Sequence, residues 1–412
     1  MYTILMPKST IKPKKIYMDY ASSALSASAN PSAIHDLGVK ERSKLEDARS
    51  KVAKILNANS NEIIFTSGAT ESNNLAILGL LQRMNFFSVA RSLASLSHSF
   101  KKVHSLPHIV TTNIEHASVL EVCKYLEKTK QAKVTYVPVG TNGIVDPRAI
   151  KKALGPNTIL VSVMYANNEI GTVQPIRDIA KEIRHFNKVN PKQNHKIFFH
   201  TDAVQAINYL PINVAQLGVD LMTFNSAKIY GPKGAGVLYV KRQVPIRGIM
   251  FGGNQEGGLR PGTENVASIL GLAQALTKTE KIKNEEVKRL TKLRDYFFNQ
   301  LSHSNILTNI RITINGDLKN RLPNNINITI PKIPSDLLVI ELSAYGIMAS
   351  AKSACKSGDG KTSHVIEAIN PKTQDTDGSL RFSLGRDTDK KDIDYTIQAL
   401  KEILTKLKKW YN

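Results

Sequence analysis

The sequence is poor in cysteine and tryptophan, with two cysteines and one tryptophan among 412 residues. Two cysteines cannot form a disulfide framework in a chain of this length, which fits a reducing compartment. No run of about 18 apolar residues occurs, so we expect neither a membrane-spanning helix nor a membrane partner. Near the N-terminus a short apolar stretch precedes the first lysines, the reverse of the order in a signal peptide. We therefore expect a cytoplasmic protein.

Acidic residues are also scarce. The chain has 34 aspartates and glutamates against 56 lysines and arginines, a formal net charge of +22. Such an excess can indicate nucleic-acid binding. However, the basic residues are scattered or lie on helix faces, and no helix-turn-helix, zinc-ligand spacing or RNA-binding aromatic motif accompanies them. We therefore expect neither a nucleic-acid partner nor a metal site, and a weak attraction to polyanions stays open.

Apolar residues make up 42% of the chain, enough for a sizeable core. Short, continuously apolar strands alternate with amphipathic helices, which predicts a mainly parallel sheet covered on both faces. In such sheets ligands bind beyond the carboxyl ends of the strands. The expected strands are 62–66, 108–112, 134–139, 158–164, 196–202 and 221–226, and the expected helices lie near 71–83, 116–128, 147–154 and 176–187.

The pattern changes after Gly262. A long helical stretch follows from 264 to 302, with apolar residues at helical spacing. Two shorter strands are expected at 309–314 and 324–330, and an amphipathic helix with one apolar stripe ends the chain. These elements predict a second domain of α+β type.

We therefore expect two domains. The large domain would cover 16–264, and the smaller C-terminal domain would cover 265–412, joined by the N-terminal segment 1–15. The serine-rich stretch at 83–107 has little periodicity, which predicts an inserted loop or a short helix on the surface of the large domain.

Three polar stretches follow expected strands. In FTSGATESNN (65–74) a Ser-Gly-Ala-Thr turn opens a helix, whose free N–H groups and dipole can bind an anion; an ordinary helix cap is the alternative. Asp202 closes a strand and could cap the next helix or face a ring nitrogen. Lys228 follows another strand and could be surface-exposed or be a buried amine that forms a Schiff base. A phosphate cradle, a carboxylate and an amine are together what pyridoxal phosphate requires.

The two cysteines stand in different surroundings. Cys123 lies on the apolar side of the helical stretch SVLEVCKYLEK, which favours a packing role. Cys355 lies in ASAKSACKSGDG, among small residues and between Lys352 and Lys356. Neighbouring cations favour the thiolate, which is the nucleophilic form, so this loop predicts chemistry at Cys355.

The same stretches, taken in order along nearly the whole chain, resemble the cysteine desulfurases of the NifS/IscS kind, in the class V aminotransferase group. The matching stretches include NPSAIH, EIIFTSGATESNNLAI, IEHASVL, YANNEIGTVQPI, HTDAVQA, KIYGPKGAGVLYV, GGNQEGGLRPGTENV, SACKSG and LRFSLGR. The resemblance implies the type I fold of pyridoxal-phosphate-dependent transferases: an α/β architecture with a mainly parallel seven-stranded sheet and a smaller α+β domain. It also implies pyridoxal 5'-phosphate as cofactor, L-cysteine as substrate and a homodimer.

The resemblance also implies roles for individual residues. Lys228 would hold the cofactor as a Schiff base through a buried amine, Asp202 would pair with the ring nitrogen, and His116 would stack on the ring and move protons. Arg381 would bind the substrate carboxylate, as a guanidinium is suited to do. The other implied contacts are Asn168 and Gln205 to the ring oxygen, Asn168 also to the substrate, Ala69, Thr70, Asn225 and Ser226 to the phosphate, and Thr263 to the phosphate of the partner subunit.

For Cys355 the resemblance implies attack on the sulfur of the bound cysteine, which leaves alanine and an enzyme persulfide. The loop is of the long form, with Ser363 eight residues after Cys355. That length resembles the iron–sulfur-assembly branch, whose members pass sulfur to scaffold proteins or tRNA-modifying enzymes. Two alternatives stay open: a selenocysteine lyase or another class V enzyme, and a basic protein that keeps the fold but only binds a partner.

The chain departs from the family at Ala227, where the family has a histidine before the lysine. An alanine cannot supply the charge-assisted hydrogen bond of that histidine, which is worth about 1.5–3 kcal/mol. We therefore expect weaker retention of the cofactor, but not its loss, because the covalent link and the other donors remain.

Overall fold

The structure is a computed structural model of the chain. It describes residues 16–24, 29–94, 106–191, 195–303, 312–351, 363–374 and 377–411, with the backbone alone at 85–94 and 408–411.

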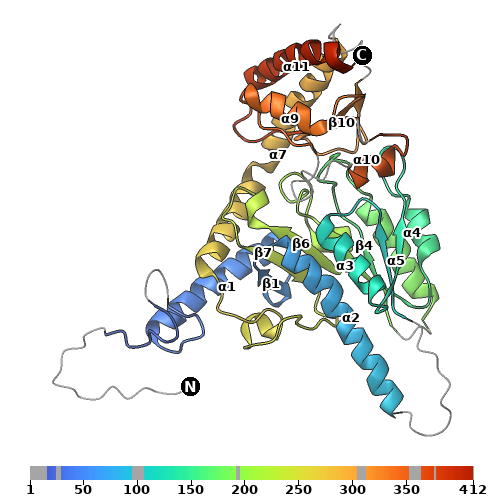
Figure 1. Cartoon of the computed structure of the whole chain (residues 1–412). Helices are drawn as coiled ribbons and strands as arrows, with labels where there is room; N and C mark the ends of the chain where they lie inside the picture. The colour runs from blue at the N-terminus through green and yellow to red at the C-terminus, as the bar shows by residue number, and fades with distance from the viewer. Residues whose placement is uncertain are drawn as a thin grey trace.

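A seven-stranded sheet forms the centre of the molecule, in the order β1-β7-β6-β5-β4-β2-β3 (Figure 1). The strands β3, β2, β4, β5 and β6 pair in parallel, whereas β7 is antiparallel to both β6 and β1. The predicted α/β class with a mainly parallel seven-stranded sheet is therefore confirmed. The strand bounds are β1 (Ile63–Thr66), β2 (His108–Thr112), β3 (Lys133–Val137), β4 (Thr158–Ser162), β5 (Phe198–Asp202), β6 (Leu221–Asn225) and β7 (Gly236–Val240).

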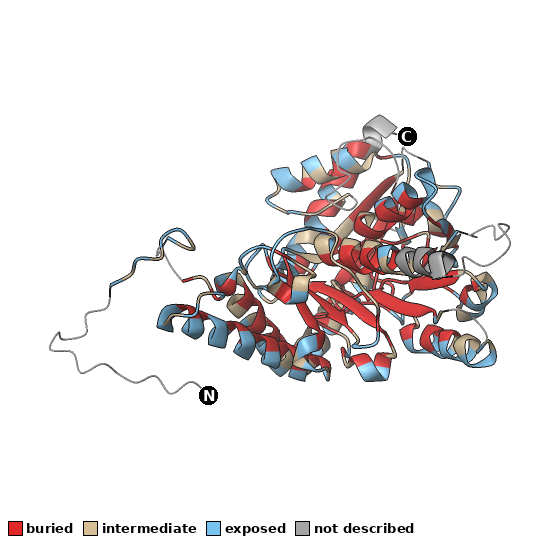
Figure 2. Ribbon diagram, turned by 90° about the horizontal axis from the view of Figure 1, so that it is seen from below, coloured by how far each residue is buried: buried red, intermediate tan, exposed pale blue. Residues whose placement is uncertain are grey.

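Alternate residues of the central strands face two separate apolar layers. On one side, Ile109, Leu160, Phe198 and Leu221 pack with α2 (Ala69–Ala94) and α3 (Ala117–Lys128). On the other side, their neighbours Val110, Val161, Phe199 and Met222 pack with α1 (Asp36–Leu56) and α5 (Ile176–Val189). Figure 2 shows the result, a buried sheet between helices whose outer faces are exposed. The remaining short elements of this part are α4 (Pro147–Ala153), α6 (Val214–Leu217) and the 3-10 turns η1 (Ser60–Glu62), η2 (Ser226–Lys228) and η3 (Gln255–Gly258).

The helix α2 is longer than the sequence predicted. It has 26 residues and continues through 83–94, the first part of the expected insertion. Leu80 to Ala94 contains no glycine and no proline, so nothing in the sequence ends the helix there. This part of the expected insertion is therefore a continuation of α2, and 95–105 lie outside the described residues.

A 37-residue helix, α7 (Val266–Ser302), links the large sheet to a second, smaller one (Figure 1). It packs along α1 and reaches the antiparallel sheet β10-β9-β8, where Phe297 lies 5.2 Å from Phe382 between ring centroids. This is the α+β part predicted from the sequence. The division at 264/265 stays a prediction, and 1–15 lie outside the described residues. The bounds are β8 (Thr313–Ile314), β9 (Asn325–Ile330), β10 (Gly378–Ser383), α9 (Ser335–Ala344), α10 (His364–Ile369) and α11 (Lys390–Tyr411).

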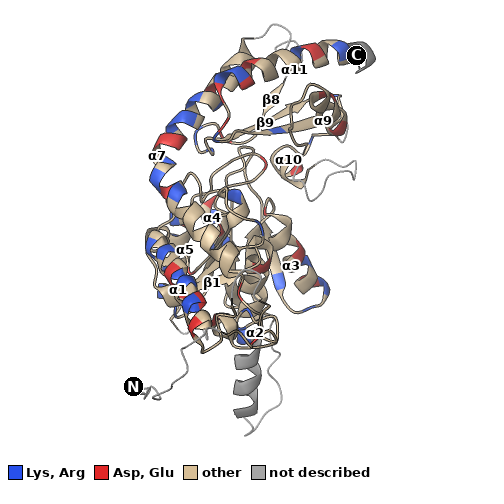
Figure 3. Ribbon diagram, turned by 90° about the vertical axis from the view of Figure 1, so that its left-hand side faces the viewer, with Lys and Arg blue, Asp and Glu red and all other residues tan. Residues whose placement is uncertain are grey.

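Charged residues of both signs are interspersed on α1, α7 and α11 (Figure 3). This distribution fits solvated helix faces rather than a single basic surface. In the described part of the chain, no helix is long and apolar enough to cross a membrane.

Candidate active site

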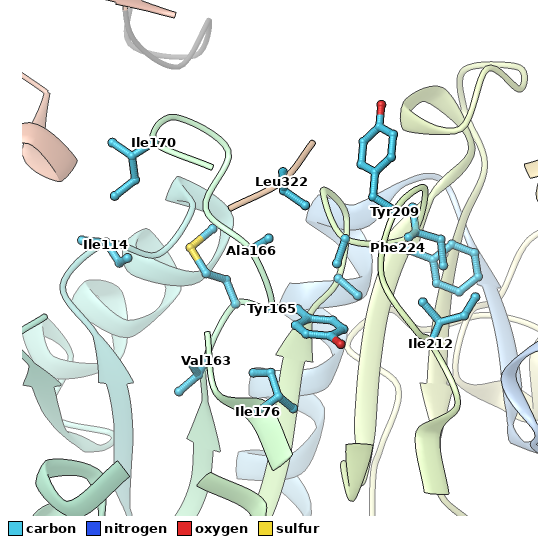
Figure 4. Close-up of a cluster of buried hydrophobic side chains, with 14 of the residues drawn as sticks. Ile114, Val163, Tyr165, Ala166, Ile170, Ile176, Tyr209, Ile212, Phe224 and Leu322 are labelled. Carbon is cyan, nitrogen blue, oxygen red and sulfur yellow. The ribbon is translucent and has the colours of Figure 1, made fainter. Parts of the chain in front are cut away.

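Loops that leave the carboxyl ends of β2, β4, β5 and β6 are held in place by buried apolar side chains. Figure 4 shows part of this cluster, with Tyr165 and Ala166 between Ile114 on one side and Phe224 on the other. Close packing of this kind leaves little freedom to the loop backbone. The polar residues on these loops therefore have fixed positions at one edge of the sheet.

Asp202 lies at this edge, as the last residue of β5, and is 5% exposed. Its Oδ1 accepts a hydrogen bond from the backbone N–H of Val204 at 3.0 Å, and its Oδ2 accepts one from Nδ2 of Asn73 at 2.8 Å. Burial raises the pKa of Asp202, whereas the two hydrogen bonds and the nearby His116 lower it. The carboxyl group is therefore oriented by two donors in a buried site.

His116 caps the N-terminus of α3. Its Nδ1 accepts from the backbone N–H of Ser118 at 3.1 Å and lies 2.8 Å from the Oγ of the same residue. The imidazole is half-buried and lines a cavity of about 430 Å³ between α2 and α3, together with Thr70. Neither Asp202 nor Lys228 lines this cavity.

The sequence predicts an anion site at the start of α2. Ala69 and Thr70 are its first two residues, so their backbone N–H groups have no partner within the helix. The Thr70 side chain is exposed at this point. Glu71 accepts from the backbone N–H of Ser67 at 2.7 Å and from Nε of Arg260 at 3.1 Å, which places a guanidinium beside the helix start. The geometry suits a phosphate group.

Lys228 ends the turn η2, which follows β6. Its N–H donates to Oδ1 of Asn225 at 3.3 Å, and its carbonyl accepts from Nδ2 of Asn208, which follows β5. The backbone of Lys228 is thus tied to the segment beyond Asp202. Contrary to the expectation of a buried amine, its side chain is exposed in the single chain, because η2 lies beyond the end of the strand and outside the core. Within the described ranges, no carboxylate lies within ion-pair distance of Nζ.

Arg381 of β10 meets Asn168 of the loop after β4, as its Nη1 donates to the Asn168 carbonyl at 3.0 Å. The structure thereby brings together the two residues predicted to bind substrate. Nε of Arg381 is buried and has no hydrogen-bond partner in the described chain. Burial lowers the pKa of Arg381, and Glu169 opposes this shift. A half-buried guanidinium whose buried Nε–H is an unused donor is suited to bind a carboxylate.

Ser226 supplies a second unused polar group. It is fully buried at the start of η2, and its Oγ has no hydrogen-bond partner among the described residues. A buried hydroxyl without a partner is uncommon and indicates a missing ligand or water. Pyridoxal phosphate and an amino-acid substrate require an amine, a phosphate-binding group, an acid and further hydrogen-bond donors. The chain offers the exposed amine of Lys228, the helix start at Thr70, the buried acid Asp202 and these unused donors. The residues therefore fit the cofactor.

Cys355 lies at 352–362, outside the described residues, but both ends of that segment are fixed. Ser350 and Arg381 exchange backbone hydrogen bonds of 3.2 and 2.7 Å. At the other end, Oγ of Ser363 donates to Oε2 of Glu169 at 2.5 Å, and Nε2 of His364 lies 3.1 Å from the carbonyl of Glu115. The two ends thus lie beside Arg381 and beside the turn that carries His116.

The other cysteine has the predicted packing role. Cys123 is fully buried in the apolar layer between α2, α3 and the sheet. Burial raises its pKa to about 12, so the thiol stays protonated and unreactive at neutral pH.

Glu115, next to His116, is a buried acid that the sequence analysis did not single out. It is 0% exposed and accepts from Oγ1 of Thr112 at 2.7 Å and from the backbone N–H of Met164 at 2.9 Å. Burial raises the pKa of Glu115 to about 8. It joins the ends of β2 and β4 and so supports the turn before α3.

The structure leaves two predicted residues apart from this cluster. Thr263 is exposed in the loop before α7, and Gln205 is half-buried after β5. Neither side chain forms a hydrogen bond within the part of the chain that the structure describes. The single chain does not contain the contact with a partner subunit that was predicted for Thr263, so that contact stays a prediction.

Sequence reasoning did not single out Asn73, Ser118 or His364, and it used Ser363 only to measure the length of the cysteine loop. Asn73 lies in the stretch ESNN and Ser118 in EHASVL. The two hydrogen-bond partners of Asn73, Ser118 and Asp202, are 45 and 129 residues away from it in the sequence. No local pattern could identify such contacts.

Comparison with known proteins agrees with this geometry. Residues 4–396 match the family model described as Aminotransferase class-V. The chain is 40% identical to the cysteine desulfurase IscS of Dictyoglomus turgidum, over 96% of both chains, and 37% identical to cysteine desulfurase IscS 1 of Archaeoglobus fulgidus, over 92% of this chain and 90% of the other. A solved NifS-like protein superposes with a TM-score of 0.78 at 35% identity, over 92% of each chain. A NifS-like protein from Rickettsia africae superposes with a TM-score of 0.74 at 26% identity, over 91% of this chain and 92% of the other. The chain therefore belongs to the class V aminotransferase family and, within it, to the cysteine desulfurases.

Proposed function

We propose that this protein removes sulfur from L-cysteine with the help of pyridoxal phosphate, forms L-alanine and a persulfide on Cys355, and passes the sulfur to an acceptor protein. The acceptor would be an iron–sulfur scaffold or a tRNA-modifying enzyme. The observation that carries the proposal is Arg381: its buried Nε–H is unused within the described chain, and its backbone is hydrogen-bonded to Ser350, where the segment that leads to Cys355 begins. It can hold an amino acid where that cysteine can reach it.

Pyridoxal phosphate, when bound, supplies an electron sink for the bonds at the α carbon of the substrate. The N–H groups of Ala69 and Thr70, with the Thr70 hydroxyl, would hold its phosphate, and Asn225 and Ser226 would add donors from the end of β6. Asp202 would pair with the ring nitrogen, and the free amine of Lys228 would form the covalent link. The other contacts would be Asn168 and Gln205 to the ring oxygen, and Thr263 to the phosphate of a second subunit in a homodimer.

Arg381 would orient the substrate. One of its Nη groups is engaged by the Asn168 carbonyl, which leaves Nε and the other Nη for a two-bond contact with the carboxylate of cysteine. Asn168 would thus fix the guanidinium as well as line the site. The bound amino acid would then present its thiol toward the segment between Ser350 and Ser363.

Cys355 would carry out the sulfur transfer. Its thiolate forms a bond to the sulfur of the substrate while the carbon–sulfur bond breaks, and the carbon keeps the electron pair and takes up a proton to give alanine. Lys352 and Lys356, one on each side in the sequence, would favour the thiolate. His116 would hold or move a proton beside the reacting amino acid.

The test is an assay of the purified chain with pyridoxal phosphate and L-cysteine, in which alanine and protein-bound persulfide are measured. We expect equal amounts of both in a single turnover. Cys355→Ser should form no persulfide but still take up the cofactor, and Lys228→Ala should not link to it. Persulfide formation by Cys355→Ser would refute the role of Cys355. A wild-type protein that processes only selenocysteine would favour a lyase, and one that does not take up the cofactor would favour a binding protein.

A further inference from the structure

Asp202 and His116 are joined by a continuous chain of hydrogen bonds. Nδ2 of Asn73 donates to Oδ2 of Asp202 at 2.8 Å and also to Oγ of Ser118 at 2.8 Å. Oγ of Ser118 lies 2.8 Å from Nδ1 of His116. The linking residues Asn73 and Ser118 are 0% and 8% exposed, so water does not compete for these contacts.

The direction of every bond in this chain follows from chemistry. The Nδ1 atom of His116 accepts the backbone N–H of Ser118 at 3.1 Å and therefore carries no hydrogen itself. The Ser118 hydroxyl must then donate to Nδ1, and it accepts from Asn73. The Asn73 amide uses both of its hydrogens, one toward Asp202 and one toward Ser118, because a carboxylate oxygen can only accept.

This arrangement sets what His116 offers to a ligand. With Nδ1 occupied as an acceptor, the neutral ring carries its hydrogen on Nε2. No group in the described ranges hydrogen-bonds to Nε2, and the ring lines the cavity of about 430 Å³ with Thr70. The Nε2–H of His116, which faces the cavity, is therefore a hydrogen-bond donor to a ligand. At the other end of the same series of hydrogen bonds, Asn73 holds one oxygen of Asp202.

We propose that Asn73 is a positioning residue which, through Ser118, fixes neutral His116 as the Nε2–H tautomer and at the same time orients Asp202. The proposal deepens the proposed function and rests on it for the roles of His116 and Asp202. Asn73 would not touch the substrate. It would set the hydrogen-bonding state of two residues that do contact the cofactor, from a buried position between them.

The tautomer can be measured directly, without any turnover. The full-length chain is labelled with ¹⁵N in histidine, and two-bond ¹H–¹⁵N spectra are recorded with and without pyridoxal phosphate at about pH 9, where imidazoles of ordinary pKa are neutral. The signals of His116 are assigned from their loss in His116→Gln. In the wild-type chain we expect a nonprotonated Nδ1 and a protonated Nε2.

Ser118→Ala removes the hydroxyl but keeps the backbone N–H. We expect the ratio of the Nδ1–H to the Nε2–H form to rise about fivefold, the factor that one net hydrogen bond gives. Asn73→Ala should move the ratio in the same direction, because the Ser118 hydroxyl is then no longer oriented. Ser118→Thr restores a hydroxyl and should restore the wild-type ratio.

A second buried serine–histidine pair in the same sheet offers a matched control. Oγ of Ser162 lies 2.9 Å from Nδ1 of His200, whose Nε2 lies 3.1 Å from Oγ1 of Thr223. Ser162→Ala should alter the His200 signals and leave those of His116 unchanged. Unaltered His200 signals in the Asn73 and Ser118 variants would in turn show that the sheet is intact.

Two results would overturn the proposal: an Nδ1–H ring in the wild-type chain, or an unchanged His116 ratio in both Ser118→Ala and Asn73→Ala. The second result would mean that the backbone N–H alone sets the tautomer. The spectra of the cofactor-free chain involve no desulfuration. This proposal can therefore fail while the alanine assay succeeds, and the expected tautomer can be observed even if the chain produces no alanine.

Discussion

Arg49 of α1 and Glu256 of η3 form a buried ion pair with two hydrogen bonds, Nη1 to Oε2 at 2.7 Å and Nη2 to Oε1 at 2.8 Å. The same Oε2 accepts the backbone N–H of Phe65 at 2.9 Å. The pair therefore joins α1, the strand β1 and the loop that leads to Thr263.

Removal of Glu256 from the Arg49–Glu256 pair should destabilise the fold. Glu256→Ala removes the buried counter-charge of the Arg49 guanidinium and leaves only the solvent-exposed Glu46 beside it, and we expect a loss of about 3–5 kcal/mol in the free energy of unfolding, measured by denaturant titration. Glu46 offers the control, because it also pairs with Arg49 at 3.1 Å but is half-exposed. Glu46→Ala should cost less than about 1 kcal/mol. Equal effects of the two substitutions would contradict this account.

Glu115 should make stability depend on pH. Burial raises its pKa to about 8 in the folded chain. Between its ordinary pKa and this value, the folded state keeps the proton that the unfolded state has lost. The contribution of Glu115 to the free energy of unfolding is therefore greatest below about pH 4.5. It falls as the pH rises toward 8, by at most about 1.4 kcal/mol per pH unit.

Glu115→Gln should remove this contribution, since an amide oxygen can still accept from Thr112 and Met164 but has no proton to lose. Unfolding measured by denaturant between pH 5 and 8 should give a flatter curve for the variant. Glu285→Gln, an exposed substitution on α7, should retain the wild-type slope. An identical slope in Glu115→Gln would show that the carboxyl group is ionised in the fold.

Arg381→Lys keeps the charge but removes the planar pair of donors. We expect kcat/KM for L-cysteine to fall by about 10- to 100-fold, the loss that corresponds to one charge-assisted hydrogen bond. Cofactor content should not change, because Arg381 is assigned to the substrate. Steady-state alanine production checks this, with Arg148→Lys at an exposed position as control. A loss confined to cofactor binding would assign Arg381 to the cofactor instead.

Ala227→His should restore a donor beside the cofactor. The side chain at this position is exposed next to Lys228, so a larger residue can be accommodated without repacking the core. We expect at least tenfold slower loss of pyridoxal phosphate to a scavenger, followed by absorbance, because a hydrogen bond to a charged group contributes about 1.5–3 kcal/mol. Ala227→Leu adds bulk without a donor and should behave like the wild type. Slower release from both variants would indicate shielding rather than hydrogen bonding.

The sequence predicted most of the large sheet because buried parallel strands appear as continuous apolar runs between amphipathic helices. The sequence analysis did not predict β7 as a separate strand. Its five residues, GVLYV, directly follow the glycine-rich stretch after Lys228, and only that lysine was singled out there. The extension of α2 beyond residue 83 was missed because its serine-rich composition suggested a surface loop.

At the candidate site, single residues could be predicted and their mutual contacts could not. Asp202 stands out by its place at a strand end and His116 by the resemblance to the family, but the amide of Asn73 that joins them depends on three elements meeting in space. The exposure of Lys228 could not be predicted either, because it depends on where the turn η2 leaves the core.

The helix α7 is a rigid rod. At 1.5 Å per residue its 37 residues extend for about 55 Å, from the packing against α1 to the small sheet. A tilt of about 5° at its lower end would displace the upper end by about 5 Å, and Arg381 with it. A change at the α1–α7 contact would thus move Arg381 relative to the large sheet.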